Sequence, residues 1–467
     1  MFSKSIKINS GNIILIKIIT GFVLLSAFCL SCNSAKKQSE EQPNILLIVA
    51  DDLGWNDVGY HGSEIKTPAI DNLAESGVVL EQFYVSPTCS PTRASLLSGR
   101  QASRFGILGP IAGKSEQVLP IGTPTVASIL KDAGYTTAIT GKWHLGLRPK
   151  NGPHKYGFEY TYGYLHGQID PYTHRYKYGD RTWHRNNEFV DEEGHATDLI
   201  TNEAMQYIRN YRDKEKPFFL YVSYSVPHFP LNEEDKWAAP YRDTIDNHFR
   251  REYAAATAHM DDAIGQLVKT LEDEKLRENT LLVFISDNGA QENWLKVQDQ
   301  YEGRYAPHDR LGDNQPLRDW KASLYEGAIR VPAIFNWPAK FKPTKIDQVT
   351  SVNDILPTLA DFSAAKIPVQ TEAEGLSLKK TLLDNAVLNE RLLYWRTPRQ
   401  FAVRDGDWKL VYSGELADGA SELFNIADDP NEKNDLADEN KDIVQRLFDE
   451  LKIQAGQDSL TSASAYE

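Results

Sequence analysis

The chain has 467 residues, of which 41% are hydrophobic, and its formal net charge is −14. This composition provides enough apolar side chains for one large core and a smaller companion domain. The acidic balance excludes a general nucleic-acid binder and a binder of anionic membranes, because both partners are held by broad basic surfaces. Any anionic substrate must therefore be bound by a local cluster of cations.

The N-terminal segment, residues 1–34, is predicted to be an export signal. Lysines precede a largely apolar run from Ile18 to Leu30, which is shorter than the roughly 20 residues needed to cross a bilayer. Leu30-Ser31-Cys32 resembles the end of a bacterial lipobox, in which the cysteine receives a lipid. We therefore expect an exported bacterial protein, either periplasmic or attached to the outer membrane or cell surface through Cys32. Ordinary signal cleavage near Ala35 is the alternative.

Cysteine is rare in this sequence. Of the 3 cysteines, Cys29 and Cys32 lie in or beside the predicted signal, so the predicted folded body holds Cys89 alone. That residue can form no internal disulfide. A lone thiol in an exported enzyme is either buried as a small apolar group or used chemically.

Buried strands are predicted where short apolar runs end abruptly in polar residues. The runs are residues 45–50 before Asp51, 136–140 before Lys142, 218–222 before His228, and 281–285 before Asp287. Helices are predicted between them, from Thr67-Pro68 to Gly77 and from Thr123-Pro124 to Gly134. This alternation predicts an α/β fold with a mainly parallel central sheet covered by helices on both faces. In such sheets the ligand lies beyond the carboxyl ends of the strands.

The pattern changes near residue 348, so we expect a catalytic domain over residues 43–347 and a C-terminal α+β subdomain over residues 348–467. The second part has a predicted helix at Val352–Phe362 and a terminal helix near residues 441–452. Asp405-Gly406 between two apolar runs predicts a β-hairpin. The subdomain should therefore carry an antiparallel sheet.

The segment at residues 89–100, Cys-Ser-Pro-Thr-Arg-Ala-Ser-Leu-Leu-Ser-Gly-Arg, places a thiol just before a proline-initiated helix. Free amides at a helix N-terminus favour an anion, and Arg93, one turn along, can reach back to the same point. The string resembles the signature of the formylglycine-dependent (type I) sulfatases, C-x-P-S/T-R followed by leucine, a hydroxyl residue, glycine and arginine. The resemblance implies that a formylglycine-generating or equivalent maturase oxidises Cys89 to formylglycine, whose hydrate attacks sulfur.

Two polar clusters fit the same family. Asp51-Asp52 and Asp287-Asn288 each follow a predicted strand, so their oxygen atoms should converge. Adjacent carboxylates are costly unless a cation lies between them, and hard oxygen ligands suit Ca²⁺. The resemblance implies a calcium site formed by Asp51, Asp52, Asp287, Asn288 and the modified Cys89.

The remaining site residues are implied by the resemblance alone. Residues 141–146, Gly-Lys-Trp-His-Leu-Gly, resemble the family's second signature, and His228 and Lys321 match its isolated histidine and lysine. The implied roles are support of formylglycine by Arg93 and Lys142, and sulfate binding by Lys321. His228 would be the general acid, and His144 the base that takes a proton from the hydrate. A phosphate-binding P-loop is excluded, because Trp143 replaces the hydroxyl residue that such a loop needs.

The resemblance extends from about Pro43 to Tyr412 and implies the alkaline-phosphatase-like fold and a sulfuric ester hydrolase. Patterns at residues 162–164 and 172–174 look closest to the branch of arylsulfatases and N-acetylgalactosamine-4-sulfatases. The substrate expected is a sulfated polysaccharide or oligosaccharide, algal or glycosaminoglycan. Sugar-binding side chains would come from an aromatic and basic set comprising Tyr164, His166, Tyr172, His174, Arg175, Tyr176 and Trp183. These residues could equally be packing residues.

Three other functions stay open at this point. A phosphodiesterase or phosphonate hydrolase of the same superfamily could use the same nucleophile. A surface lipoprotein that binds glycans without catalysis would need a broken active site, whereas every polar position of the family pattern is filled here. A metal hydrolase could use Cys89 as an unmodified thiol.

Overall fold

The structure is a computed structural model that describes residues 42–296 and 300–459. The predicted export signal and the lipid attachment at Cys32 lie outside the described residues. Within the described part, no helix is both long enough and apolar enough to cross a membrane. The described residues from Pro43 onward form one compact unit, and the domain boundary near residue 347 stays a prediction.

A ten-stranded sheet in the order β13-β2-β12-β11-β1-β10-β4-β5-β8-β9 forms the centre. Strands β11, β1, β10, β4 and β5 run parallel, while β12 and β8 pair antiparallel at either side. The strands are β1 Asn44–Ala50, β2 Val78–Leu80, β4 Thr136–Lys142, β5 Tyr160–Tyr164, β8 Trp183–Arg185, β9 Glu188–Phe189, β10 Phe218–Ser223, β11 Thr280–Ser286, β12 Ala333–Asn336 and β13 Thr344–Ile346. The mainly parallel sheet is confirmed, as are the predicted strands.

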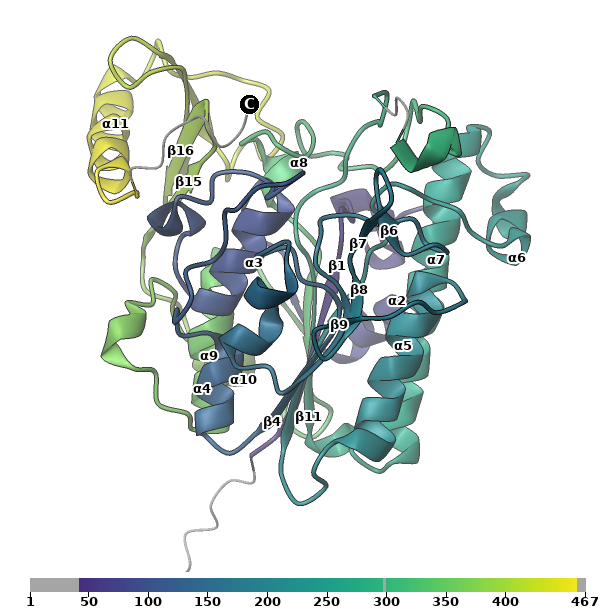
Figure 1. Ribbon diagram of the computed structural model, residues 1–467. Coiled ribbons are helices and arrows are strands. Elements are labelled where there is room, and N and C mark those ends of the chain that lie inside the picture. The colour runs from purple at the N-terminus through teal and green to yellow at the C-terminus, as the bar shows by residue number, and fades with distance from the viewer. Residues whose placement is uncertain (1–41, 297–299, 460–467) are drawn as a thin grey trace, which may run out of the picture. The chain divides into compact units, whose positions relative to one another are not determined.

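Helices cover both faces of this sheet (Figure 1). One face carries α3 Cys89–Ser98, α4 Val126–Asp132, α9 Ile355–Ser363 and α10 Lys379–Asp384. The other face carries α2 Pro68–Ser76, α5 Ala196–Gln206 and α7 His248–Asp273. Shorter elements are β3 Phe83–Tyr84 paired with β14 Thr350–Ser351, β6 Arg175–Tyr176 paired with β7 Asp180–Arg181, α6 Asp235–Ala238 and α8 Glu326–Ile329.

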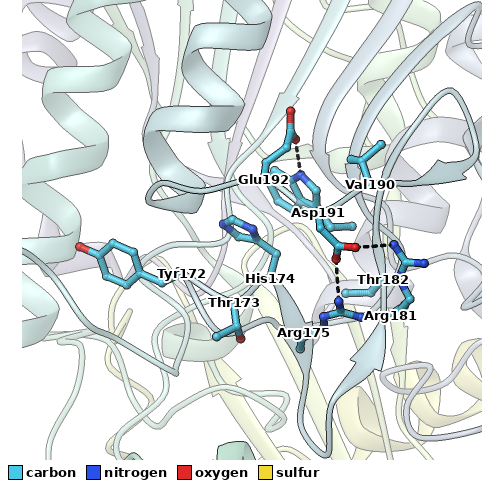
Figure 2. Close-up of a pocket in the computed structure, with 10 residues that line it drawn as sticks. Tyr172, Thr173, His174, Arg175, Arg181, Thr182, Val190, Asp191 and Glu192 are labelled. Carbon is cyan, nitrogen blue, oxygen red and sulfur yellow. Dashed lines mark hydrogen bonds and ion pairs between the residues drawn. The ribbon is translucent and has the colours of Figure 1, made fainter.

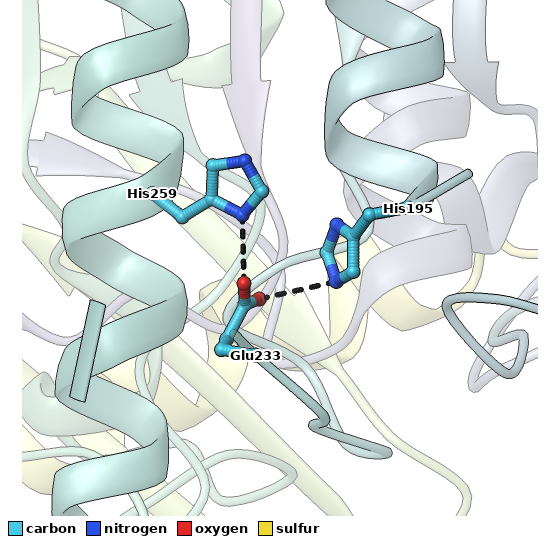
Figure 3. Close-up of side chains that lie close together, drawn as sticks. All are labelled: His195, Glu233 and His259. Atoms are coloured by element: carbon cyan, nitrogen blue, oxygen red, sulfur yellow. Dashed lines mark hydrogen bonds and ion pairs between the residues drawn. The ribbon is translucent and has the colours of Figure 1, made fainter. Parts of the chain in front are cut away.

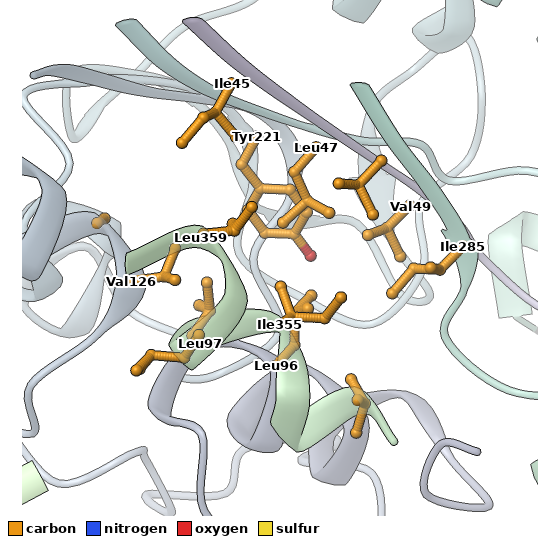
Figure 4. Close-up of a cluster of buried hydrophobic side chains, with 14 of the residues drawn as sticks. Ile45, Leu47, Val49, Leu96, Leu97, Val126, Tyr221, Ile285, Ile355 and Leu359 are labelled. Carbon is orange, nitrogen blue, oxygen red and sulfur yellow. The ribbon is translucent and has the colours of Figure 1, made fainter. Parts of the chain in front are cut away.

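Strand β1 shows why helices must cover both faces of the sheet. All its residues are buried, and successive side chains of a strand point to opposite faces. Ile45, Leu47 and Val49 therefore enter the core shared with α3, α4 and α9. Figure 4 shows side chains of these helices packed against those of the sheet. Leu46 and Ile48 enter the core shared with α2, α5 and α7.

Two helix starts differ from the prediction. Helix α4 begins at Val126, because the hydroxyl of Thr125 accepts from the Ser128 amide at 3.2 Å and the Ser128 hydroxyl accepts from the Thr125 amide at 2.8 Å. This reciprocal pair of hydrogen bonds, a capping box, sets the start of the helix, and Pro124 lies just outside it. Helix α3 begins at Cys89 itself, with Pro91 inside its first turn. Proline is tolerated there, since the first amides of a helix have no partner within the helix.

The C-terminal part forms a separate four-stranded antiparallel sheet of β15 Leu392–Arg396, β16 Gln400–Asp405, β17 Trp408–Ser413 and β18 Ala420–Asn425. The predicted hairpin is confirmed, with Gly406 at φ 57° in the turn between β16 and β17. Helix α11, Lys441–Ala455, covers this sheet through Leu447 and Leu451.

A buried ionic cluster links the four-stranded sheet to α8 and β3. Lys409 on β17 donates to Glu326 of α8 at 2.9 Å and lies 2.8 Å from Glu432. Tyr84 on β3 donates to the second oxygen of Glu326 at 2.6 Å. All four side chains are buried. Buried charges are tolerated only when they are paired. Lys409 contacts both carboxylates, so we expect its charge to be the main compensation for their burial.

We predict that Lys409→Met lowers the free energy of unfolding by about 3–5 kcal/mol, because it leaves the buried Glu432 without its cation and leaves Glu326 with the longer 3.8 Å contact to Arg330. Urea denaturation measures the change. Lys150→Met, at an exposed position, is the matched control and should stay within about 0.5 kcal/mol of the parent protein. Equal losses in both variants would contradict the assigned role.

Candidate active site

Polar residues follow the parallel strands at a single edge of the sheet. Asp51 and Asp52 come directly after β1, Lys142 ends β4, and Asp287 comes directly after β11. His228 lies on the loop after β10. Since parallel strands present their carboxyl ends at one edge, these side chains meet there.

Cys89 lies at the same edge, as the first residue of α3. Its sulfur and a carboxylate oxygen from each of Asp51 and Asp287 lie within 4.8 Å of one another. Burial raises the pKa of the thiol, although Lys142 and Lys321 oppose the rise. An unmodified Cys89 is therefore a protonated thiol, which argues against its use as a nucleophile without modification.

Arg93 is buried and uses all its nitrogen atoms. Nε and Nη2 donate to Asp287 Oδ2 at 3.0 and 2.8 Å. Nη1 donates to the Lys142 carbonyl at 3.2 Å, and also to the hydroxyls of Tyr221 and Ser223. Arg93 thus joins the ends of three strands beneath Cys89. Neither Tyr221 nor Ser223 was predicted from the sequence, because Tyr221 lies within the apolar run 218–222, which indicates only a core strand, and Ser223 follows that run without a motif of its own.

Lys142 pairs with Asp51 through a 2.7 Å contact between Nζ and Oδ2, and both side chains are fully buried. The preceding Gly141 has φ 107°, and a Cβ there would lie 1.8 Å from the Ser223 carbonyl oxygen. Only glycine therefore allows β4 to approach β10 at this point, which brings Lys142 beside Asp51.

Lys321 pairs with Asp52, with Nζ 2.7 and 2.8 Å from its two oxygens. The Asn288 amide donates to Oδ1 of the same carboxylate at 2.7 Å. Burial alone would raise the pKa of Asp52, but Lys321 and then His228 outweigh it and lower the pKa to about 2. The Lys321 side chain is 10% exposed, whereas that of Lys142 is fully buried, so Lys321 is the more accessible of the two lysines.

Two oxygen atoms of this cluster have no hydrogen-bond partner among residues 42–296 and 300–459: Asp51 Oδ1 and Asn288 Oδ1, both buried. Burial raises the pKa of Asp51 to about 7, and Asp287 adds to the rise, while Lys142 opposes it. Buried polar atoms are normally satisfied. The donor set of carboxylate and amide oxygens therefore fits a hard divalent cation such as Ca²⁺.

His228 faces the cluster from the loop after β10. Its Nδ1 donates to the Phe229 carbonyl, and Nε2 lies 3.7 Å from Asp52 Oδ2. Burial and the positive charge of Lys321 lower the pKa of His228 to about 3, so the ring is neutral at pH 7 with Nε2 unprotonated. The ring of Trp294 lies 5.7 Å away. Sequence analysis missed Trp294, since the segment around it departs from the family pattern.

His144 lies in the left-handed region at φ 59°, which is rare for a residue with a side chain. Its Nε2 donates to the Ile111 carbonyl at 2.9 Å, which leaves Nδ1 with a lone pair and no partner within the described residues. The Ser90 hydroxyl donates to the His144 carbonyl at 2.9 Å and so ties this loop to α3 beside Cys89. The pKa of His144 lies well below its usual value, because the ring is buried and near Lys142.

The expected sugar-binding set is mostly buried, which overturns the carbohydrate interpretation for those members. Tyr164, His174, Tyr176 and Trp183 are at most 4% exposed and stack on neighbouring rings. A buried ring offers no face to a sugar.

Part of the same set lines a small hollow (Figure 2). The hollow holds about 100 Å³, well below the roughly 300 Å³ of a small ligand pocket. Arg175 and Arg181 at its rim bind Asp191 at 2.6 and 2.9 Å, so their charges are already paired. Tyr172 remains the exposed ring of the set, at 37%.

Sequence comparison identifies relatives of this chain. The model of the sulfatase family matches residues 43–363, and that of the C-terminal part of N-sulphoglucosamine sulphohydrolase matches residues 319–457. Arylsulfatase J of Mus musculus is 31% identical, over 88% of this chain and 75% of its own length. N-acetylgalactosamine-6-O-sulfatase of Bacteroides thetaiotaomicron is 28% identical, over 94% of this chain and 98% of its own length.

Solved structures agree with this result. The crystal structure of Ps i-CgsB in complex with k-i-k-neocarrahexaose has a TM-score of 0.79 and 31% sequence identity, and the match covers 90% of this chain and 94% of that one. The chain therefore belongs to the sulfatase family, the alkaline-phosphatase-like hydrolases of sulfuric esters.

Proposed function

We propose that this sulfatase removes sulfate esters from polysaccharides or oligosaccharides, with formylglycine at position 89 and Ca²⁺ bound by Asp51, Asp52, Asp287 and Asn288. One observation carries the proposal: the buried sulfur of Cys89 lies within 4.8 Å of two carboxylate oxygens, beside two buried oxygens without partners. When present, formylglycine would supply a nucleophilic hydroxyl, and Ca²⁺ would supply positive charge for the sulfate oxygens.

The side chains of this chain divide the remaining work. Arg93 and Lys142 hold Asp287 and Asp51 rigidly, so that the reacting groups need little rearrangement. Lys321 faces incoming substrate and would bind a sulfate oxygen, exchanging part of its contact with Asp52 for the new anion. Positioning of this kind is a large share of catalysis.

Two histidines would move protons. His144 carries a free lone pair on Nδ1, which suits a base. His228 presents an unprotonated Nε2 in the free enzyme, so it must first gain a proton before it can donate one to the leaving sugar oxygen. A bound sulfate favours that protonation, because a nearby anion raises the pKa of an imidazole.

The carbohydrate substrate is supported by the relatives. One relative carries the name of an N-acetylgalactosamine-6-O-sulfatase, and one similar structure holds a neocarrahexaose. Because the net charge of the chain is −14, a sulfated substrate must be bound by the local cations of the site. A screen of sulfated oligosaccharides, with released sulfate as the readout, identifies the substrate; faster turnover of an aryl phosphodiester than of an aryl sulfate would overturn the proposal.

We predict that peptide mass mapping of active protein will find formylglycine at position 89. Cys89→Ala should abolish turnover and leave the melting temperature nearly unchanged, since the substitution removes only a small buried group that makes no disulfide. Full activity in protein that carries only the unmodified thiol would contradict the prediction.

We predict that chelation lowers both the rate and the melting temperature, because Asp51, Asp52 and Asp287 then repel one another. Ca²⁺ should restore both, with a stabilisation of about 2.7 kcal/mol at 100 times the dissociation constant. Asp287→Asn should lose the calcium-dependent shift of the melting temperature. The metal assignment fails if fully demetallated protein keeps its rate and its melting temperature.

We predict that His228→Ala loses about 10²- to 10⁴-fold in kcat on sugar sulfates, the usual contribution of a general acid. The loss should be much smaller on an aryl sulfate, because a phenolate leaves without a proton. Arg93→Ala is the control and should damage both substrates alike, since it disturbs Asp287. Equal losses for His228→Ala would transfer the acid role to Lys321.

A further inference from the structure

A second cluster of metal-binding side chains lies outside the active site (Figure 3). It consists of His195, Glu233 and His259, and one ligand atom from each lies within 4.8 Å of the others. His259 Nδ1 is 2.7 Å from Glu233 Oε2, and His195 Nε2 is 3.4 Å from Glu233 Oε1. Figure 3 shows the carboxylate between the two rings.

The cluster is buried and comes from three separate segments. His195 precedes α5, His259 lies in α7, and Glu233 lies on the loop after β10. Their side chains are at most 4% exposed. Even so, His195 Nε2 and Glu233 Oε1 have no hydrogen-bond partner in the described part of the chain, although they face each other. Buried polar atoms normally have a hydrogen-bond partner, so these two atoms are available to bind a ligand.

The outer contacts of His259 match those of a metal ligand. Its Nε2 lies 3.1 Å from Asp198 Oδ1, and a carboxylate in this place orients a metal-binding imidazole. The Trp237 ring stacks on His259 at 4.6 Å and 15° and so restrains its rotation. The Asp198 side chain is 46% exposed, so the outer side of the cluster reaches the surface.

We propose that His195 Nε2, Glu233 and His259 Nδ1 bind a zinc-type divalent cation, with water as the fourth ligand. Two imidazoles and one carboxylate suit Zn²⁺, whereas the oxygen ligands of the active site suit Ca²⁺. The ion takes the place of the proton that His259 Nδ1 shares with Glu233. His195 must also move its proton from Nε2 to Nδ1, which ends the 3.2 Å contact in which Nδ1 accepts from the Thr197 amide.

The site is structural. Glu233 follows His228 on the loop after β10, so the ion fastens that loop to α5 and α7 and steadies the loop that carries His228. The proposal stands apart from the sulfatase reaction, and its failure would leave the proposed function untouched.

The test uses the full chain, stripped of metal and then saturated with Ca²⁺. Zn²⁺ is added alone and its binding is measured by equilibrium dialysis and elemental analysis, together with the melting temperature. The parent protein should bind one equivalent of Zn²⁺ and melt at a higher temperature. Glu233→Gln and His195→Ala should lose this binding, and Asp198→Asn should weaken it by about 10- to 100-fold. His154→Ala, which changes a histidine outside the cluster, should bind as the parent does.

Further measurements separate this site from its rivals. Asp287→Asn should keep the Zn²⁺, since it alters only the calcium cluster. Loss of Zn²⁺ in Asp287→Asn with retention in Glu233→Gln would overturn the proposal, as would failure of the parent to bind Zn²⁺. Should Glu233→Gln fail to fold, the visible spectrum of the parent protein loaded with Co²⁺ tests the proposal. Strong absorption supports a tetrahedral site with imidazole ligands, whereas the weak spectrum of hydrated Co²⁺ contradicts it.

Discussion

Mutual repulsion among Asp51, Asp52 and Asp287 is the constraint on which the rest of the structure depends. Three buried carboxylates at one edge of a sheet would separate unless cations held them. Lys142 binds the first, Lys321 the second and Arg93 the third. Each carboxylate thus has its own cation, and the oxygen atoms that remain unpartnered define where a further cation fits.

The scaffold around these pairs is rigid because several conformations in it are unfavourable for an isolated chain. Asp52 and His144 both have positive φ angles, of 66° and 59°. Gly167 packs so closely on His144 that a Cβ there would lie 2.5 Å from the imidazole. Such conformations persist only where the surrounding core determines them. The two cores on the faces of the sheet provide that support.

The C-terminal sheet contributes to the site although it holds none of the charged cluster. The Lys321 amide donates to the Ala290 carbonyl at 3.1 Å, beside Asn288. In the same segment, Arg318 contacts Glu422 on β18 at 3.3 Å and the Glu432 carbonyl at 3.0 Å. Lys409 holds Glu326 a short way further along the chain. The second sheet therefore restrains the segment that carries Lys321.

The sequence by itself determined the features that depend on near neighbours. The apolar runs before Asp51 and Asp287 predicted strands, Asp405-Gly406 predicted the hairpin, and residues 89–100 predicted the family. Periodicity, turn residues and a contiguous signature are local properties of a chain, so they can be read without coordinates. The placement of the polar residues at the carboxyl edge of the sheet followed from the rules of parallel sheets.

Only the tertiary structure decided which distant residues meet. It brought Tyr221 and Ser223 to Arg93, put Trp294 beside His228, and enclosed most of the aromatic set that could have bound sugar. It also assembled His195, Glu233 and His259 from three separate segments. Contacts between such distant positions leave no periodic pattern in the chain, because burial and pairing arise only when separate elements pack together.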